Sequence, residues 1–122
     1  MQENIECALN KDSLVDITTT GRKTSLARRI EIGFQYIENT IFISGLSGKR
    51  GWYANLLAKP AFTFHLKQSV QADIPAVATP IIEAARRRQV LTIIVAKWKR
   101  SDKIEAFVKS SPLIEVYFSE MV

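Results

Sequence analysis

The sequence contains few of the residues that build metal, disulfide or hydrolytic sites. Cys7 is the single cysteine and His65 the single histidine among 122 residues. One cysteine excludes an intramolecular disulfide and a cysteine-based zinc site, and one histidine excludes a metal site built on several histidines. The acidic residues are scattered along the chain, so no pair of catalytic carboxylates is evident. Hydrolytic chemistry therefore has no visible machinery.

Long hydrophobic runs are also missing. No apolar stretch approaches the ~20 residues that span a bilayer, and residues 1–10 lack the basic-then-apolar pattern of a secretory signal. We therefore expect a cytoplasmic protein without a transmembrane segment. Hydrophobic residues make up 47% and charged residues 24%, which indicates one globular domain over residues 1–122. The net charge of +5 suits an anionic partner without identifying it.

Alternating side chains predict several strands. Apolar residues at every second position of residues 27–37 indicate a strand with one buried face. Glu38 and Asn39 then predict a tight turn into a strand over residues 40–44, which makes a hairpin. Apolar, β-branched and aromatic residues predict further strands over residues 13–20, 61–67, 70–77 (interrupted by Pro75) and 113–118.

Helical spacing follows in three places. Residues 52–59 predict a helix that Pro60 ends, and residues 104–108 predict a short one. Thr79 and Pro80 are typical of a helix start, so a longer helix is expected from there to about Trp98. The fold class is mainly β (α+β): an antiparallel sheet of about six strands that closes into a small barrel, with two or three helices.

Three reactive or charged features are interpreted as structural. His65 lies in an apolar strand, where a histidine with satisfied hydrogen bonds is expected. Cys7 has no histidine nearby and is expected to be an inert thiol. Three consecutive arginines, Arg86 to Arg88, spread over about 200° of a helix and predict a solvated face rather than one anion site.

Two segments, unlike the features above, are candidates for ligand binding. The turn over residues 20–25, with the arginines that follow it, gathers cations, hydroxyls and free backbone N–H groups at one hairpin end, which favours binding of an anion. Residues 44–55 place a glycine-rich loop before a helix, and such a loop lets the backbone approach a phosphate or a flat ring. This loop is neither a Walker loop nor a dinucleotide fingerprint.

Together the two segments resemble the deazaflavin-dependent nitroreductase family, which belongs to the flavin/deazaflavin oxidoreductases with the split β-barrel fold. The matching residues are Thr-Thr-Gly-Arg-Lys-Thr at 19–24, then Arg28, and Trp-Tyr-Ala-Asn-Leu-Leu-Ala-Lys-Pro at 52–60. Ser25 stands where the family usually has glycine. The resemblance implies a cytoplasmic oxidoreductase that uses a deazaflavin coenzyme (F-420 type), or FMN, for hydride transfer to a small organic acceptor.

The resemblance also implies where the cofactor binds. It assigns the phosphate to the hairpin turn and the ring and side chain to the glycine-rich loop, and it implies that two residues of the helix brace that loop. The expected cofactor-binding residues are Arg22, Lys23, Thr24 and Arg28 of the turn, Ser44, Gly45, Gly48 and Lys49 of the loop, and Trp52 and Asn55 of the helix. No metal site is expected. The cofactor supplies the chemistry in such proteins, so no acid–base residue is required.

Three alternatives stay open. One is a protein of the same fold that uses FMN, and another is a non-catalytic split barrel that binds FMN or another small ligand. A nucleic-acid-binding barrel would show aromatic residues interleaved with basic ones on exposed strands, whereas the aromatics here have apolar neighbours, so no nucleic-acid partner is expected. A homodimer is expected, because a small open barrel leaves strand edges uncovered and residues 91–96 are apolar almost all round their helix.

Overall fold

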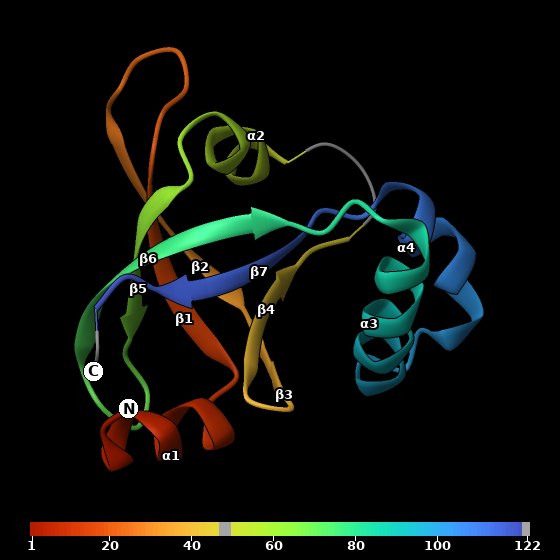
Figure 1. The fold of residues 1–122 in the computed structure, drawn as a ribbon, viewed down its shortest axis with the longest axis horizontal. Coiled ribbons are helices and arrows are strands. Elements are labelled where there is room, and N and C mark those ends of the chain that lie inside the picture. The colour runs from red at the N-terminus through yellow and green to blue at the C-terminus, as the bar shows by residue number, and fades with distance from the viewer. Residues whose placement is uncertain (47–49, 121–122) are drawn as a thin grey trace.

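A curled antiparallel sheet forms the body of the molecule (Figure 1). The computed structural model describes residues 1–46 and 50–120. In the described residues the sheet has seven strands in the order β2-β1-β5-β6-β7-β4-β3. The strands are β1 Leu14–Thr20, β2 Ala27–Gly33, β3 Gln35–Ile37, β4 Thr40–Ser44, β5 Ala61–Leu66, β6 Ala72–Pro80 and β7 Leu113–Phe118. The helices are α1 Glu3–Lys11, α2 Gly51–Ala58, α3 Ala84–Lys97 and α4 Ile104–Ser110, with a 3-10 turn at Ser101–Lys103.

The mainly β, antiparallel α+β class is confirmed, but the expected element counts are wrong. The structure has seven strands instead of about six, and four helices instead of two or three. The additional helix is α1, whose buried side chains Ile5, Ala8 and Leu9 recur at helical spacing. The additional strand arises because residues 27–37, expected as one strand, break into β2 and β3.

That break at Phe34 joins the two edges of the sheet. Residues 27–33 pair with β1 at one edge, and residues 35–37 pair with β4 at the other. Phe34 lies between them, is 3% exposed, and donates its backbone N–H to the carbonyl of Ser13 at 3.1 Å. Because one bent segment contributes to both edges, the sheet curls into a half-barrel.

The hairpin turn expected at Glu38 and Asn39 is present. Both residues have positive φ values, 50° and 64°. Two successive left-handed residues are the geometry of the two-residue turn that matches the twist of antiparallel strands. The sequence signal was therefore sufficient for this hairpin.

The expected helix start at Thr79 and Pro80 is wrong. Both residues belong to β6, where they pair with Glu115 and Ile114 of β7. Helix α3 begins only at Ala84. The side chain of Glu83 caps it by accepting hydrogen bonds from two backbone N–H groups of the first turn. Pairing with a strand some 35 residues away outweighs the local capping signal.

Pro75 was expected to interrupt this strand, but β6 continues through it because of its place in the ladder. Its carbonyl accepts from Ser119 N at 2.8 Å, just past the end of β7. In an antiparallel strand the N–H and C=O of one residue face the same neighbour, so the missing N–H also faces this end. The strand therefore loses no hydrogen bond to β5.

Two apolar cores lie on opposite sides of the sheet. The larger fills the curl and includes buried side chains of α1 and α2 as well as Phe64, which is fully buried. The smaller lies between α3, α4 and the outer face of β4 and β7, and it includes Phe42 and Leu113. Figure 1 shows α3 and α4 beside the sheet, away from α1 and α2. Strand β4 and the first half of β7, residues 113–116, are therefore buried on both faces.

The three consecutive arginines do not share one environment, so the interpretation of a solvated face is wrong for the middle one. The side chains of Arg86 and Arg88 are 45% and 49% exposed and pair with Glu115 and Glu105. Arg87 is only 9% exposed. Successive helical residues point about 100° apart, so one of three can face the interior.

Candidate functional site

A pocket of about 470 Å³ lies between the β1–β2 hairpin and the first turns of α2. Figure 1 shows these two elements side by side at one end of the molecule. The pocket is lined by Thr19, Gly21, Arg22, Lys23, Thr24, Arg28, Ile30, Gly51, Trp52 and Asn55. Six of these are residues that the sequence predicted for cofactor binding, drawn from segments about thirty residues apart.

The strand register decides which arginine reaches the pocket. Thr19 pairs with Arg28 across β1 and β2, so the two side chains share the face that lines the pocket. The next residue, Arg29, points to the opposite face, where its Nε donates to Asp16 Oδ2 at 2.9 Å. Neighbouring arginines thus have different environments, and only Arg28 lines the pocket.

The turn between β1 and β2 is tightly closed. Gly21 N donates to Leu26 O at 2.8 Å, and Thr24 Oγ1 accepts from Leu26 N at 3.2 Å. A Cβ atom on Gly21 would lie 2.6 Å from Thr24 Oγ1, so only glycine fits without displacement. Ser25 has φ 60°, the left-handed region that favours glycine. Ser25, which stands where the nitroreductase family usually has glycine, is therefore the turn residue with a left-handed conformation.

Asn55 of α2 holds the turn to the helix. Its side-chain oxygen accepts from Arg22 N at 3.2 Å and from Arg22 Nη1 at 3.0 Å, and its amide donates to Thr19 Oγ1 at 3.4 Å. Asn55 is 8% exposed, so these bonds are largely shielded from water. We expected Asn55 to brace the glycine-rich loop, and in the described part of the chain its side chain bonds to the hairpin.

Lys59 is a second brace that the sequence reasoning missed. Its Nζ donates to Ser25 Oγ at 2.7 Å and to Gly21 O at 3.3 Å. Its position between the helix and Pro60 was visible in the sequence, but its partners lie more than thirty residues away. No local pattern therefore pointed to them.

The expected loop residues are placed differently from the turn residues. Ser44 is 6% exposed and donates its hydroxyl to Pro112 O at 2.7 Å, and neither it nor Gly45 lines the pocket. A Cβ built on Gly45 would lie 3.7 Å from Trp52 Cζ2, so the loop begins beside the pocket's indole wall. The predictions for Gly48 and Lys49 fall outside the described residues.

The electrostatics of the pocket favour an anion. Arg22, Lys23 and Arg28 supply three cations, and no acidic side chain is among the described residues that line it. Hydroxyls of two threonines and the apolar surfaces of Ile30 and Trp52 complete the wall. This residue set fits a ligand with a phosphate and a flat apolar ring, as a flavin or deazaflavin has.

His65 is structural, as expected. Its ring nitrogens lie 2.7 Å from Thr18 Oγ1 and 2.7 Å from Asp73 Oδ1, on the outer face of the sheet. The hydrogen bond with His65 lowers the pKa of the Asp73 carboxyl. Cys7 is exposed and unpaired. Residues 1–46 and 50–120 contain no group of histidine, cysteine and acidic side chains that could hold a metal ion.

Solved structures identify the fold first. A structure described as an F420 reductase has a TM-score of 0.71 at 14% identity, covering 98% of this chain and 97% of that one. An F420-H2 dependent reductase has a TM-score of 0.62 at 19% identity, covering 86% and 94%. The heme storage protein HutZ from Vibrio cholerae has a TM-score of 0.69 at 13% identity, covering 98% and 91%. At such low identity these similarities show the fold, which proteins of different function share.

The family follows from the sequence. The model of the F420H(2)-dependent quinone reductase family matches residues 3–112, so the chain belongs to this family. No curated protein matches it. Family membership confirms the expected class of a deazaflavin-dependent oxidoreductase with a split-barrel fold. Among the described residues, no helix has both the length and the apolar character needed to cross a membrane.

Proposed function

We propose that the pocket binds a deazaflavin with its phosphate against Lys23 and Arg28, and that the protein uses it to reduce a quinone or a similar small organic acceptor. The observation that carries the proposal is the wall of three cations next to the indole of Trp52, with no acid among the described lining residues. When bound, a reduced deazaflavin supplies a hydride, which together with one proton from solvent converts a quinone into a hydroquinone.

The protein's own residues bind the cofactor and orient it. Lys23 and Arg28 neutralise the phosphate, and the Thr24 hydroxyl completes the anion site. Asn55 holds the turn in place before the ligand arrives, so less ordering is needed on binding. The apolar wall at Ile30 and Trp52 shields one side of the ligand from water.

Titration of the purified protein with oxidised deazaflavin and with FMN tests the proposal. Arg28→Ala and Lys23→Ala each remove a charge-assisted hydrogen bond worth about 1.5–3 kcal/mol, so the Kd should rise roughly ten- to a hundredfold. Arg29→Ala is the matched control: it removes the same charge one residue away, on the face opposite the pocket. Its Kd should stay near that of the wild type.

Two outcomes contradict the proposal. One is equal weakening by Arg28→Ala and Arg29→Ala, which would indicate general attraction by the basic chain rather than a built site. The other is failure of the wild type to bind either cofactor below about 100 μM, equivalent to ~5.5 kcal/mol. Tighter binding of FMN than of deazaflavin would favour the flavin alternative within the same fold.

A non-catalytic binding protein is the second candidate, because the heme storage protein from Vibrio cholerae shares the fold. Turnover separates the two functions. Under the first proposal, reduced deazaflavin is oxidised in the presence of a quinone such as menadione at a rate that depends on protein concentration. Tight cofactor binding without turnover of any quinone or nitroaromatic acceptor supports storage.

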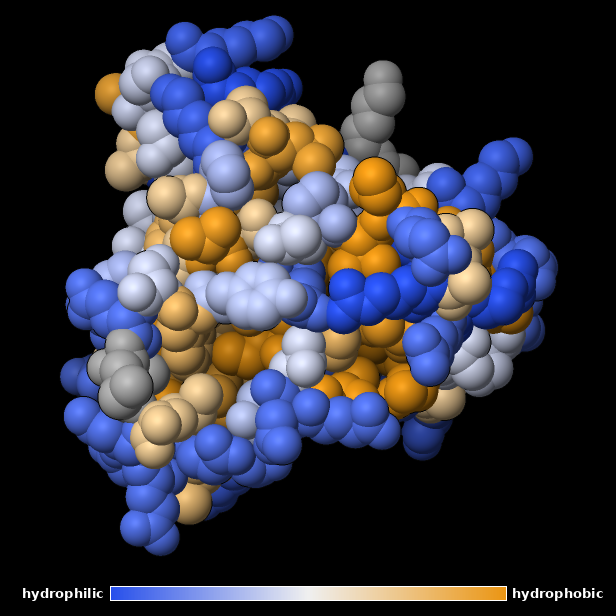
Figure 2. Space-filling model, viewed as in Figure 1, coloured by the Kyte–Doolittle hydropathy of each residue, from blue (hydrophilic) through white to orange (hydrophobic). Residues whose placement is uncertain are grey.

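We also propose that the protein forms a homodimer through the outer face of its sheet. Ala61, Val77 and Tyr117 stand directly opposite one another across β5, β6 and β7, and Val77 and Tyr117 are 38% and 54% exposed. Figure 2 shows apolar surface interrupted by charged side chains on the side where β6 and β7 lie. One structural neighbour with a TM-score of 0.66 is described as a domain-swapped dimer.

Light scattering of the wild type at micromolar concentration tests the dimer. Val77→Lys places a charge in the centre of the proposed interface and should shift the protein to a monomer. Ile93→Lys is the control, since Ile93 is 39% exposed but lies on α3. A wild-type monomer, or dissociation caused by Ile93→Lys alone, would contradict the sheet-face interface; the second result would indicate the helix instead.

A further inference from the structure

Arg87 is a buried arginine whose donors are almost fully used by backbone carbonyls. Its Nε donates to Val108 O at 2.9 Å, and its Nη1 donates to Ile81 O at 2.9 Å. Its Nη2 donates to Phe107 O at 3.2 Å and to Ser111 O at 2.7 Å. Four of the five N–H groups of the guanidinium are thus occupied. One side chain connects the start of α3, the end of α4 and the segment that leads into β7.

This environment differs from that of both neighbouring arginines. Among the described residues, the ion pairs include Arg86 with Glu115 and Arg88 with Glu105, and none includes Arg87. The carbonyls around Arg87 include those of the last turn of α4, where a helix carries partial negative charge. The guanidinium therefore gives Val108 O a partner at the helix end, and it adds a second donor to Phe107 O, which also accepts from Ser111 N at 3.0 Å.

The segment that Arg87 holds contacts the start of the glycine-rich loop. Ser111 Oγ donates to Gly45 O at 3.3 Å, and the buried hydroxyl of Ser44 donates to Pro112 O at 2.7 Å. The ring of Pro112 also lies beside Gly45, since a Cβ built there would be 3.5 Å from Pro112 Cγ. Residues 111 and 112 therefore fix the course of the chain through residues 44 and 45.

Gly45 in turn lies beside the pocket wall. A Cβ built on Gly45 would lie 3.7 Å from Cζ2 of Trp52, so the indole stands next to this glycine, and Trp52 lines the pocket. We infer that Arg87 is a positioning residue: by anchoring residues 111–112 it holds residues 44–45 and, through them, the Trp52 side of the pocket. This inference rests on the proposed function, because the Trp52 wall matters for cofactor binding only if the pocket binds a cofactor. Arg87 would then influence cofactor affinity from outside the phosphate site, on the opposite side of the pocket.

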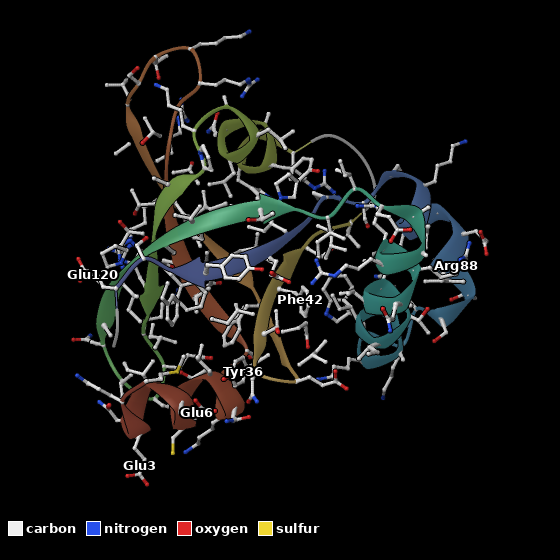
Figure 3. All side chains as sticks on the ribbon, in the orientation of Figure 1. Glu3, Glu6, Tyr36, Phe42, Arg88 and Glu120 are labelled. Atoms are coloured by element: carbon white, nitrogen blue, oxygen red, sulfur yellow. The ribbon has the colours of Figure 1, made fainter. Side chains whose placement is uncertain are left out.

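Hydrogen exchange of the cofactor-free protein tests the positioning without any ligand. Arg87→Lys keeps the charge, but one ammonium cannot reach four carbonyls spread over three segments. We expect exchange about tenfold faster in peptides covering residues 41–46 and 107–113, as loss of a shielded hydrogen bond would produce, with the hairpin over residues 14–30 unchanged. Arg88→Lys is the matched control, because Figure 3 shows Arg88 at the α3–α4 pair, away from the sheet. That variant should leave both regions unchanged.

A second variant isolates the path to the loop. Ser111→Ala removes the hydroxyl that bonds Gly45 and leaves the Ser111 carbonyl available to Arg87. It should speed exchange at residues 41–46 but not at 107–110, and adding Arg87→Lys should speed 41–46 further, because the Ser44–Pro112 hydrogen bond remains in Ser111→Ala. This variant also serves if Arg87→Lys fails to fold. Unchanged exchange at 41–46 in Ser111→Ala, or equal acceleration in every strand of folded Arg87→Lys, would overturn the inference.

Cofactor titration adds the functional readout. Arg87→Lys should raise the Kd for deazaflavin about tenfold while Arg88→Lys leaves it unchanged. Competition by inorganic phosphate should be equal in the wild type and Arg87→Lys, because the turn that carries Lys23 and Arg28 is untouched. Faster loop exchange with an unchanged Kd would overturn the role of Arg87 in binding. Failure of the wild type itself to bind deazaflavin would instead refute the proposed function, while the exchange result would still decide the anchoring.

Discussion

Replacement of Asn55 by leucine should loosen the β1–β2 hairpin while keeping the bulk of the side chain. The amide of Asn55 makes three hydrogen bonds: Arg22 N at 3.2 Å, Arg22 Nη1 at 3.0 Å and Thr19 Oγ1 at 3.4 Å. Leucine can make none of them. Because Asn55 is 8% exposed, little water replaces the amide on the Thr19 side. The loss of stability is therefore larger than it would be for an exposed turn residue.

The magnitude follows from the three bonds. Each contributes a net of about 0.5–1.5 kcal/mol. The 3.4 Å bond is long, and Arg22 is exposed, so its guanidinium recovers bonds to water and its share lies near the lower limit. The sum is about 2 kcal/mol in the free energy of unfolding. For a chain of this length that lowers Tm by roughly 6–10 °C.

Urea unfolding followed by far-UV circular dichroism measures this difference. Arg22→Ala is the partner variant: it removes the guanidinium but keeps the backbone N–H that Asn55 also accepts. It should therefore cost about 0.5 kcal/mol, well below the full effect of Asn55→Leu. A loss under about 0.5 kcal/mol for Asn55→Leu, or one matched by Arg22→Ala, would refute the assignment of Asn55 as the brace.

Two further predictions concern the turn and the outer face. Gly21→Ala places a Cβ 2.6 Å from Thr24 Oγ1, which should destabilise the fold by about 1–3 kcal/mol, and Thr24→Ala should recover most of that loss in urea unfolding of the double variant. The hydrogen bonds of Lys67 and Arg29 lower the pKa of the Asp16 carboxyl from its usual 3.8, so its contribution is present above that value and disappears as the pH falls through the lower folded-state pKa. Asp16→Asn should therefore unfold at lower urea than the wild type at pH 7, with a difference that shrinks at pH 3; a constant difference would contradict this reading.

Most strands could be predicted from the sequence because their signals are local. The alternation through residues 27–37 correctly indicates which side chains face inward, and Phe34 at 3% exposure agrees with it. The same alternation cannot show that the segment breaks, because the break depends on two different partners, β1 and β4. Likewise, Thr79 and Pro80 carry a true capping pattern that pairing with β7 overrides.

Some residues of the candidate site could likewise be predicted from local sequence, and others could not. The turn over residues 20–25 was predicted as an anion site from its own cations and hydroxyls, and the structure places Arg22, Lys23 and Thr24 in one pocket with Arg28. The partners of Asn55 and Lys59 lie more than thirty residues away in sequence, and no local spacing indicates them. The prediction that Asn55 braces the glycine-rich loop therefore did not include its bonds to the hairpin.

The sequence alone determined what depends on neighbouring residues: strand periodicity, the turn at residues 38–39, the cations of the hairpin and the motifs of the family. Periodicity and turn conformation are set by the sterics of adjacent residues, so they survive without knowledge of the fold. Only the tertiary structure decided which of three arginines is buried, which strand edges meet, and which side chains hold the pocket's two walls. Those outcomes depend on long-range pairing and burial, whose free energies exceed the local preferences they override.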